Sequence, residues 1–208
     1  MIRVEHASLR FEEKIVFNDF NYTFEDKKIY CLLGRSGCGK TTLMRMIAGL
    51  QKPDRGQITF NGQEVHRSMP EIFMMHQSYS NFPWMTVLEN VLLPFKLKQK
   101  ITPELVEEAK GMLARVGLEG SENLHPYELS GGMKQRVALA RVLIAKPRVL
   151  LMDEPLSALD PLTRGKMQDV LLEIHHSQEN VTGNLIIMVT HDPAEAEKLQ
   201  EVTLRLGA

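Results

Sequence analysis

The segment Gly34–Thr41 constrains this chain more than any other feature. It reads Gly-Arg-Ser-Gly-Cys-Gly-Lys-Thr and stands between the apolar run Ile29–Leu33 and an apolar helical pattern over Leu43–Leu50. A loop of the form G-x-x-x-x-G-K-[ST] between a strand and a helix lets backbone N–H groups and the helix N-terminus face one anion. The segment therefore predicts a phosphate-binding loop (P-loop).

Individual residues of this loop have predictable roles toward ATP. Lys40 reaches the β- and γ-phosphates, the Thr41 hydroxyl holds Mg²⁺, and Thr42 is placed to reach the α-phosphate. Because Cys38 lies inside the loop, alkylation of its thiol is expected to block nucleotide binding. The rest of the predicted phosphate site is the loop itself, which comprises Gly34, Arg35, Ser36, Gly37, Cys38 and Gly39.

Short apolar runs predict the core of the fold. Ile29–Leu33, Val149–Met152 and Leu185–Val189 are apolar at consecutive positions, as in parallel strands that are buried on both faces. Helical patterns over 103–116 and 161–178 separate or follow them. Alternating strands and helices indicate an α/β fold with a mainly parallel sheet.

Two further regions depart from this alternation. Residues 1–30 alternate apolar and polar residues in short stretches, and the segment near Ile58 has hairpin character, which together predict a small N-terminal antiparallel β-subdomain. Residues from roughly 82 to 147 show mostly helical patterns and are expected to form a helical subdomain inserted between two core strands. Thr102, Ser130 and Asp160 are expected N-caps of helices.

A second phosphate-related signal is the run Arg148–Glu154, Arg-Val-Leu-Leu-Met-Asp-Glu. A buried strand would deliver Asp153 to the carboxyl edge of the sheet, where ligands of open α/β sheets bind. Asp153 would hold Mg²⁺ directly or through water, and Glu154 could orient or deprotonate a water that attacks the γ-phosphate.

A third signal is Leu129–Arg136, Leu-Ser-Gly-Gly-Met-Lys-Gln-Arg, which leads into another apolar helix. Ser130 can cap that helix, and Gly131 and Gly132 leave backbone N–H groups open to an anion. One ATP does not need two glycine-rich anion sites in one chain. Two chains that face each other head to tail would use both, each supplying its second site to the other's nucleotide.

Together these motifs resemble the ATP-binding cassette (ABC) family, whose LSGGQ signature reads LSGGM here. The resemblance extends over nearly the whole chain and implies roles for four further positions. Gln77 resembles the Q-loop glutamine that contacts Mg²⁺ or the attacking water. Asp160 belongs to a D-loop-like segment at the dimer interface, and His191 resembles the switch histidine at the γ-phosphate. Phe11 stands where the family places an aromatic that stacks on adenine, although it could instead pack in the β-subdomain.

The resemblance implies a single ABC nucleotide-binding domain over 1–208, with the 82–147 helical subdomain inserted in its RecA-like core. Such a domain is an ATPase that uses ATP and Mg²⁺ and works as a homodimer or paired cassette. Its partners would be integral-membrane permease subunits and, for an importer, a solute-binding protein. It would be cytoplasmic and peripheral on the inner face of the cell membrane.

The segment Met74–Pro94 is similar to importers of the nitrate, sulfonate and taurine group, which favours import of a small solute. An exporter or lipoprotein-release ATPase is the main alternative, and transport direction separates the two. Met69, Met74, Met75 and Met85 would either contact a permease or fill the core.

Composition and charge exclude some of the remaining classes of function. The formal net charge of −1 gives no basic surplus for a nucleic-acid partner, so a non-transport ABC protein acting on DNA or ribosomes is disfavoured. The longest apolar runs are far shorter than the ~20 residues that cross a bilayer. The two cysteines do not suggest a disulfide framework. The end of the sequence at Ala208 leads us to expect no C-terminal regulatory domain.

Overall fold

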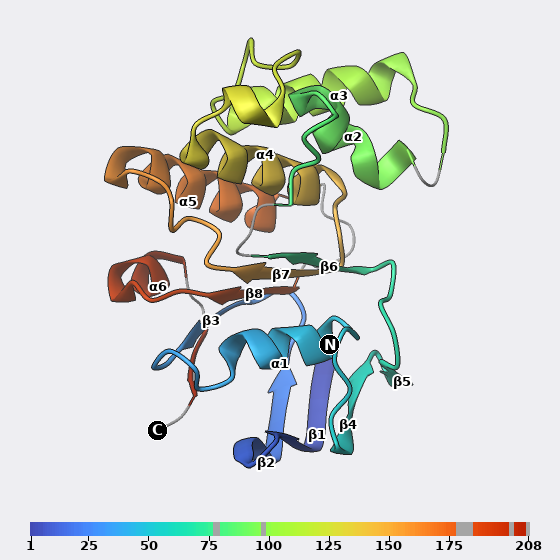
Figure 1. Ribbon diagram of the computed structural model, residues 1–208, viewed down its shortest axis with the longest axis vertical. Helices are drawn as coiled ribbons and strands as arrows, with labels where there is room; N and C mark the ends of the chain where they lie inside the picture. Colours follow the sequence, from blue (N-terminus) through green and yellow to red (C-terminus); the bar gives the residue numbers. More distant parts are fainter. Residues whose placement is uncertain (77–79, 97–98, 178–184, 200–201, 207–208) are drawn as a thin grey trace. The chain divides into compact units, whose positions relative to one another are not determined.

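The computed structural model of the protein describes residues 1–76, 80–96, 99–177, 185–199 and 202–206. The chain forms two compact units (Figure 1). The strand unit comprises Met1–Met74, Arg148–Asp153 and Val181–Ala208, and the helical unit comprises Met75–Pro147 and Glu154–Asn180. The helical unit thus contains the range 82–147 and also the segment that follows Asp153.

The first sheet of the strand unit is the antiparallel one. It consists of four strands in the order β2-β1-β4-β5, and this confirms the expected N-terminal antiparallel β-subdomain. Strand β1 alternates buried and exposed residues until a bulge near His6, whose φ is 52°. The strands are β1 (Ile2–Phe11), β2 (Lys14–Phe24), β4 (Arg55–Phe60) and β5 (Gln63–Glu64).

The second sheet has the strand order β6-β7-β8-β3-β9, and its β7–β8, β8–β3 and β3–β9 pairs are parallel. All residues of β7 and β8 are buried, which explains their unbroken apolar sequences. Val189 pairs with Asp153 on one side and with Leu32 on the other, so three strands end at one edge. The strands are β3 (Ile29–Leu33), β6 (Ile72–Met75), β7 (Val149–Asp153), β8 (Leu185–Val189) and β9 (Val202–Arg205).

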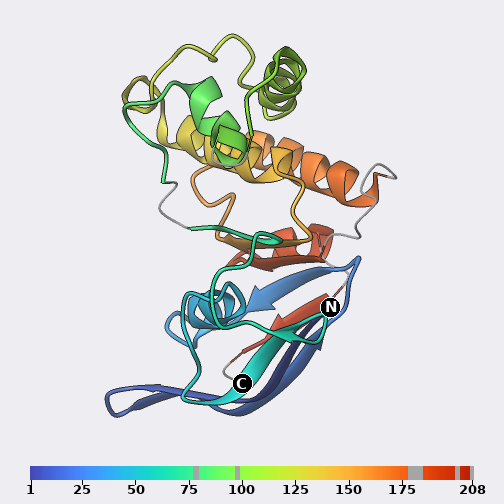
Figure 2. The same ribbon diagram turned by 90° about the vertical axis from the view of Figure 1, so that its right-hand side faces the viewer.

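Helix α1 (Lys40–Ile47) lies between the two sheets of this unit (Figure 2). Its buried residues Leu43, Met44 and Ile47 belong to one hydrophobic cluster with residues of both sheets. Met69 and Met74 are partly buried against the same cluster, Met75 is 3% exposed, and Met85 is partly buried. Of the four methionines, Met75 is thus the one that is buried. The unit also contains α6 (Pro193–Leu199).

The helical unit contains the expected capped helices. Thr102 accepts a hydrogen bond from the Leu105 N–H at the start of α3, and Asp160 accepts from two N–H groups at the start of α5. None of the described helices is long and apolar enough to cross a membrane. The helices are α2 (Val87–Lys96), α3 (Pro103–Arg115), the 3₁₀ turn η1 (Pro126–Glu128), α4 (Gly131–Ile144) and α5 (Pro161–His176).

Candidate nucleotide-binding site

The predicted P-loop connects β3 to α1. Gly39 stands at the N-cap of α1 with φ 104°, a conformation that L side chains rarely adopt. A Cβ atom on Gly39 would lie 2.7 Å from Val16 Cγ1 and 2.9 Å from Phe17 Cζ, both on β2. Only glycine fits this position. Because glycine offers no side-chain acceptor, the first N–H groups of α1 keep their capacity for an anion.

Lys40 places a positive charge inside this loop. Its side chain is 6% exposed, and its Nζ donates to the carbonyl oxygens of Gly34 at 2.7 Å and Arg35 at 3.0 Å. The Cys38 sulfur lies 3.9 Å from the same nitrogen. The ammonium group is therefore held by backbone carbonyls of the loop that it serves, and is not neutralised by a carboxylate there.

Thr41 and Asp153 meet across the strand unit. The Thr41 hydroxyl donates to Asp153 Oδ2 at 2.8 Å, although the residues are 112 positions apart. Asp153 is the last residue of β7 and is 5% exposed. A hydroxyl and a carboxylate oxygen side by side are the hard ligands that Mg²⁺ prefers, so this pair fits the expected metal. Gln77, the other expected metal contact, lies outside the described residues.

The loop after β8 carries His191 at the same sheet edge. Thr190 is 2% exposed, and its hydroxyl accepts from the Asp192 N–H at 3.1 Å while it donates to the Glu195 carboxylate. Glu195 is also buried, at 7% exposure. This buried pair defines the turn that presents the exposed His191, and sequence reasoning did not identify Glu195.

The end of the β1–β2 hairpin adjoins the tip of the P-loop. Phe11 is opposite Lys14 in the strand pairing, and Lys14 Nζ donates to the Gly37 carbonyl at 3.2 Å. The Phe11 side chain is 49% exposed. Phe11 is thus a half-exposed aromatic residue at the end of β1, opposite the β2 residue that contacts the loop.

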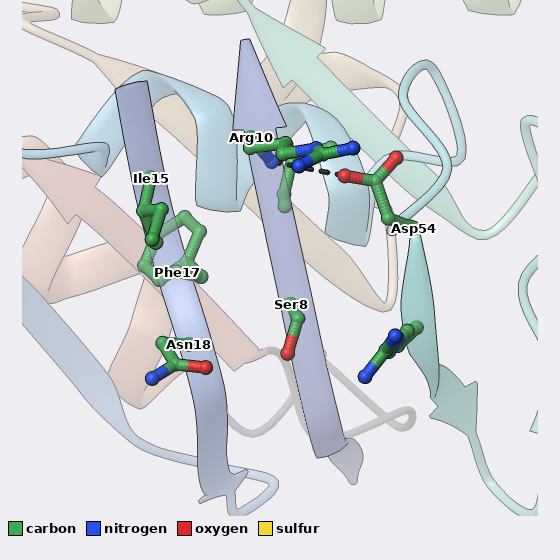
Figure 3. A pocket seen from close by; sticks show the side chains of 8 residues that line it. Ser8, Arg10, Ile15, Phe17, Asn18 and Asp54 are labelled. Carbon is green, nitrogen blue, oxygen red and sulfur yellow. Dashed lines mark hydrogen bonds between the residues drawn. The ribbon is translucent and has the colours of Figure 1, made fainter. Parts of the chain in front are cut away.

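A separate cavity of about 510 Å³ lies on the antiparallel sheet (Figure 3). Its wall includes the Arg10 N–H, which donates to Asp54 Oδ2 at 3.0 Å. The cavity contains none of the predicted phosphate or metal residues, so motif and geometry, not cavity size, locate the candidate site. Its lining residues are Ser8, Leu9, Arg10, Ile15, Phe17, Asn18, Asp54 and Arg55.

The helical unit carries the second glycine-rich motif at the start of α4. Ser130 accepts from the Met133 N–H at 3.2 Å and so caps the helix as expected. Gly131 is exposed, and a Cβ atom added there would meet nothing within 4 Å. Gly132 is tighter, since its added Cβ would lie 3.2 Å from the Ala158 carbonyl oxygen.

Charged groups surround this motif. Hydrogen bonds from Thr163, first the side chain and then the backbone, lower the pKa of Asp160, with a smaller contribution from the Leu162 N–H. Burial lowers the pKa of Arg136, and the charge of Asp160 partly opposes that effect. Arg136 donates to the Val116 and Gly117 carbonyl oxygens at 2.9 and 2.7 Å. Arg136 thus anchors the C-terminal end of α3.

The backbone of Glu154 has a left-handed conformation, which is unusual for a residue other than glycine. Its φ is 51°, and its carbonyl oxygen accepts from the Gln135 side chain at 3.1 Å and from the Ser157 hydroxyl at 3.0 Å. Gln135 is fully buried, and sequence reasoning gave it no role. The available signal was its place inside the glycine-rich motif.

These features define a P-loop nucleotide-binding domain, and the comparisons with known proteins name its family. Residues 17–157 match the model for the ABC transporter family. The chain is 43% identical over 206 residues to the Fe(3+) ions import ATP-binding protein FbpC of Escherichia coli O157:H7, a match covering 98% of this chain and 58% of that protein. It is 44% identical over 183 residues to the taurine import ATP-binding protein TauB of Pelagibacter ubique, covering 88% and 68%.

The fold also matches a solved structure. The dimeric post-hydrolysis state of the ATP-binding cassette MJ0796, bound to ADP and Pi, aligns with a TM-score of 0.87 at 29% identity, covering 99% of this chain and 94% of that chain. The chain belongs to the ABC transporter family and forms an ATPase domain of the kind found in that family, as the motifs predicted. It spans little more than half the length of FbpC.

Proposed function

We propose that this chain is the ATP-hydrolysing subunit of a multi-chain ABC importer and works as a head-to-tail dimer. The observation that carries the proposal is the Thr41–Asp153 contact at 2.8 Å beside the buried Lys40, which joins two separate motifs into one phosphate and metal site. Lys40 and the N–H groups at the start of α1 bind phosphate oxygens. Thr41 and Asp153 hold Mg²⁺, with Gln77 as the expected third contact. The metal, when bound, neutralises charge that develops on the phosphate oxygens.

Within this site, Glu154 is the proposed general base. It follows Asp153 directly in the chain, and its carboxylate can take the proton of the attacking water. His191 is proposed to position the γ-phosphate, and Phe11, half exposed beside the P-loop, to stack on adenine. Catalysis by these residues relies on positioning and electrostatics and forms no covalent intermediate with the chain.

A second chain is proposed to complete each site. Ser130, Gly131 and Gly132 lie at the start of α4, where the first N–H groups of a helix have no partner within the helix, while the P-loop of the same chain provides a separate anion site. Asp160 lies in the neighbouring loop and is assigned to the dimer interface. The matching MJ0796 cassette is dimeric, which supports the pairing of two chains.

The transport role rests on the relatives. FbpC and TauB are both named as import proteins. They are 43% and 44% identical to this chain, respectively. We propose that permease subunits hold the chain on the inner face of the cell membrane and that a solute-binding protein delivers the substrate. One relative is named for Fe³⁺ and the other for taurine, so similarity of the cassette does not itself select a substrate. Small solutes of the nitrate, sulfonate and taurine class are the first to screen.

Two substitutions test the proposed ATPase. Glu154→Gln should bind ATP normally but hydrolyse it at least about 100-fold more slowly, because it removes the general base. Lys40→Ala should weaken ATP binding about tenfold or more, because it removes a charge-assisted contact. Equilibrium nucleotide binding and steady-state phosphate release measure the two effects. Hydrolysis by Glu154→Gln within tenfold of wild type would remove the assigned base, and unchanged binding by Lys40→Ala would remove the assigned phosphate contact.

A further inference from the structure

Gln135 is a fully buried amide that connects two functional segments of the helical unit. It lies in the first turns of α4, five residues after the capping Ser130. Its Nε2 donates to the Glu154 carbonyl oxygen at 3.1 Å, and its Oε1 accepts from the Ala158 N–H at 3.0 Å. Both ends of one side chain therefore hold the backbone of the loop that begins with Glu154.

The backbone that Gln135 holds is strained. Glu154 has a φ of 51°, a left-handed conformation that a non-glycine residue keeps only when its surroundings impose it. Three donors converge on its carbonyl oxygen, namely Gln135 Nε2, the Ser157 hydroxyl at 3.0 Å and the Ser157 N–H at 3.3 Å. Ser157 is itself part of this loop, so Gln135 is the donor among these that comes from a packed helix.

The start of α4 also packs directly against this loop. A Cβ atom on Gly132 would lie 3.2 Å from both the Ala158 carbonyl oxygen and Leu159 Cδ2. The motif Leu129–Arg136 and the loop 154–158 thus approach each other closely at two places, one through the Gln135 amide and one through the bare backbone of Gly132.

We propose that Gln135 is a positioning residue that sets the backbone of Glu154 in its own chain. This inference rests on the proposed function, in which Glu154 acts on the nucleotide of its own chain while the start of α4 serves the partner's nucleotide. The amide then ties the base of one site to the glycine-rich motif of the other. A buried glutamine that only satisfies two backbone groups would stabilise the fold without favouring either site.

Mixed dimers of the 208-residue chain separate these two roles. The reference dimer pairs a wild-type chain with a Glu154→Gln chain, so that one site hydrolyses. In the cis dimer, the chain with intact Glu154 also carries Gln135→Met. In the trans dimer, the Glu154→Gln chain carries Gln135→Met. Methionine keeps the length of the side chain but removes both hydrogen bonds, and two affinity tags isolate each pair.

We expect kcat of the cis dimer to fall about tenfold below the reference, which corresponds to about 1.4 kcal/mol of transition-state stabilisation. The KM for ATP should stay within twofold of the reference, and the trans dimer should hydrolyse within twofold of the reference. An equal loss in both dimers, a loss in the trans dimer alone, or no loss in either would each overturn the proposal.

Two controls keep the test decisive. Gln168→Met changes another buried glutamine of the helical unit, on α5, and should leave kcat unchanged in both placements. If Gln135→Met does not fold, Ser157→Ala replaces it, because Ser157 is exposed and its hydroxyl donates to the same Glu154 carbonyl oxygen. Ser157→Ala should lower kcat about threefold in the cis dimer only. The proposed function fails separately, if the homodimer of Glu154→Gln hydrolyses ATP at the wild-type rate.

Discussion

The two glycine-rich helix starts of this chain differ in what their glycines are needed for. At the start of α1, Gly39 has a left-handed backbone and no room for a Cβ atom, and the buried Lys40 is held by carbonyl groups of its own loop. At the start of α4, Ser130 caps the helix through its side chain, and Gly131 is exposed with open space around it. The first site is demanded by the fold of its own unit. Nothing described around Gly131 requires a glycine there.

The difference separates a glycine that packing within the chain requires from a glycine that such packing does not require. A glycine imposed by neighbouring side chains is explained by the chain itself, as Val16 and Phe17 explain Gly39. A glycine with free space around it, as Gly131 has, is not required by packing within the described chain. In the proposed dimer, a second chain would bring its nucleotide to the start of α4, and three predictions test that proposal.

The largest expected effect comes from alkylating Cys38. Its sulfur lies 3.9 Å from Lys40 Nζ, so an adduct would occupy the loop and abolish ATP binding. Cys31 is an internal control, because it is completely buried and burial, with a smaller effect of the Glu195 charge, raises the pKa of its thiol to about 12. Mass spectrometry should find one modified cysteine, and ATP should protect it. If the labelled chain binds ATP like the unlabelled chain, the P-loop is not the self-contained site described above.

The strands that carry the P-loop, Asp153 and His191 could be predicted because each is buried on both faces. Ile29–Leu33 and Leu185–Val189 form strands with the predicted bounds, and Val149–Met152 continues by one residue to Asp153. Strand β9 was not predicted, since its four residues are half-buried or exposed and show no apolar run. Helix α2 contains Pro94, a residue that would suggest an earlier end from sequence alone.

The intermediate effect is expected for Gly131→Ala. The methyl group meets nothing in its own chain, so the free energy of unfolding and ATP binding by the monomer should be unchanged or slightly improved. Hydrolysis by the dimer should fall about tenfold, equivalent to about 1.4 kcal/mol, because the methyl group stands where the partner's nucleotide would approach.

Gly39→Ala is the matched opposite of this variant. Its Cβ atom would lie 2.7 Å from Val16 Cγ1, so it should lower both stability and ATP binding of the monomer. Thermal unfolding, monomer binding and phosphate release, measured on both variants, give the comparison. Wild-type hydrolysis by Gly131→Ala would contradict a ligand at α4.

Motif spacing identified candidate ligand-binding side chains, and the structure brings two of them, Thr41 and Asp153, within hydrogen-bonding distance. It did not predict Gln135, which contacts the Glu154 carbonyl oxygen, or Glu195, which contacts the hydroxyl of Thr190 beside His191. Such contacts depend on where a carbonyl oxygen lies after folding, as the Glu154 carbonyl does for Gln135. In the sequence, the only sign of such a contact is a polar residue at a helical position where an apolar residue would be expected.

The smallest effect concerns the cap of α4. Ser130→Ala should cost about 1 kcal/mol of unfolding free energy, seen as a decrease of about 2–4 °C in Tm, because the Met133 N–H loses its acceptor. Thr102→Ala at the cap of α3 should cost a similar amount and leave hydrolysis unchanged.

Ser130→Asp separates the two roles of the residue, since aspartate also caps a helix but adds a negative charge where an anion is expected. It should restore Tm while hydrolysis by the dimer stays below wild type. Recovery of both would mean that the start of α4 meets no anion, and the two glycine-rich helix starts would then differ in function as well as in structure.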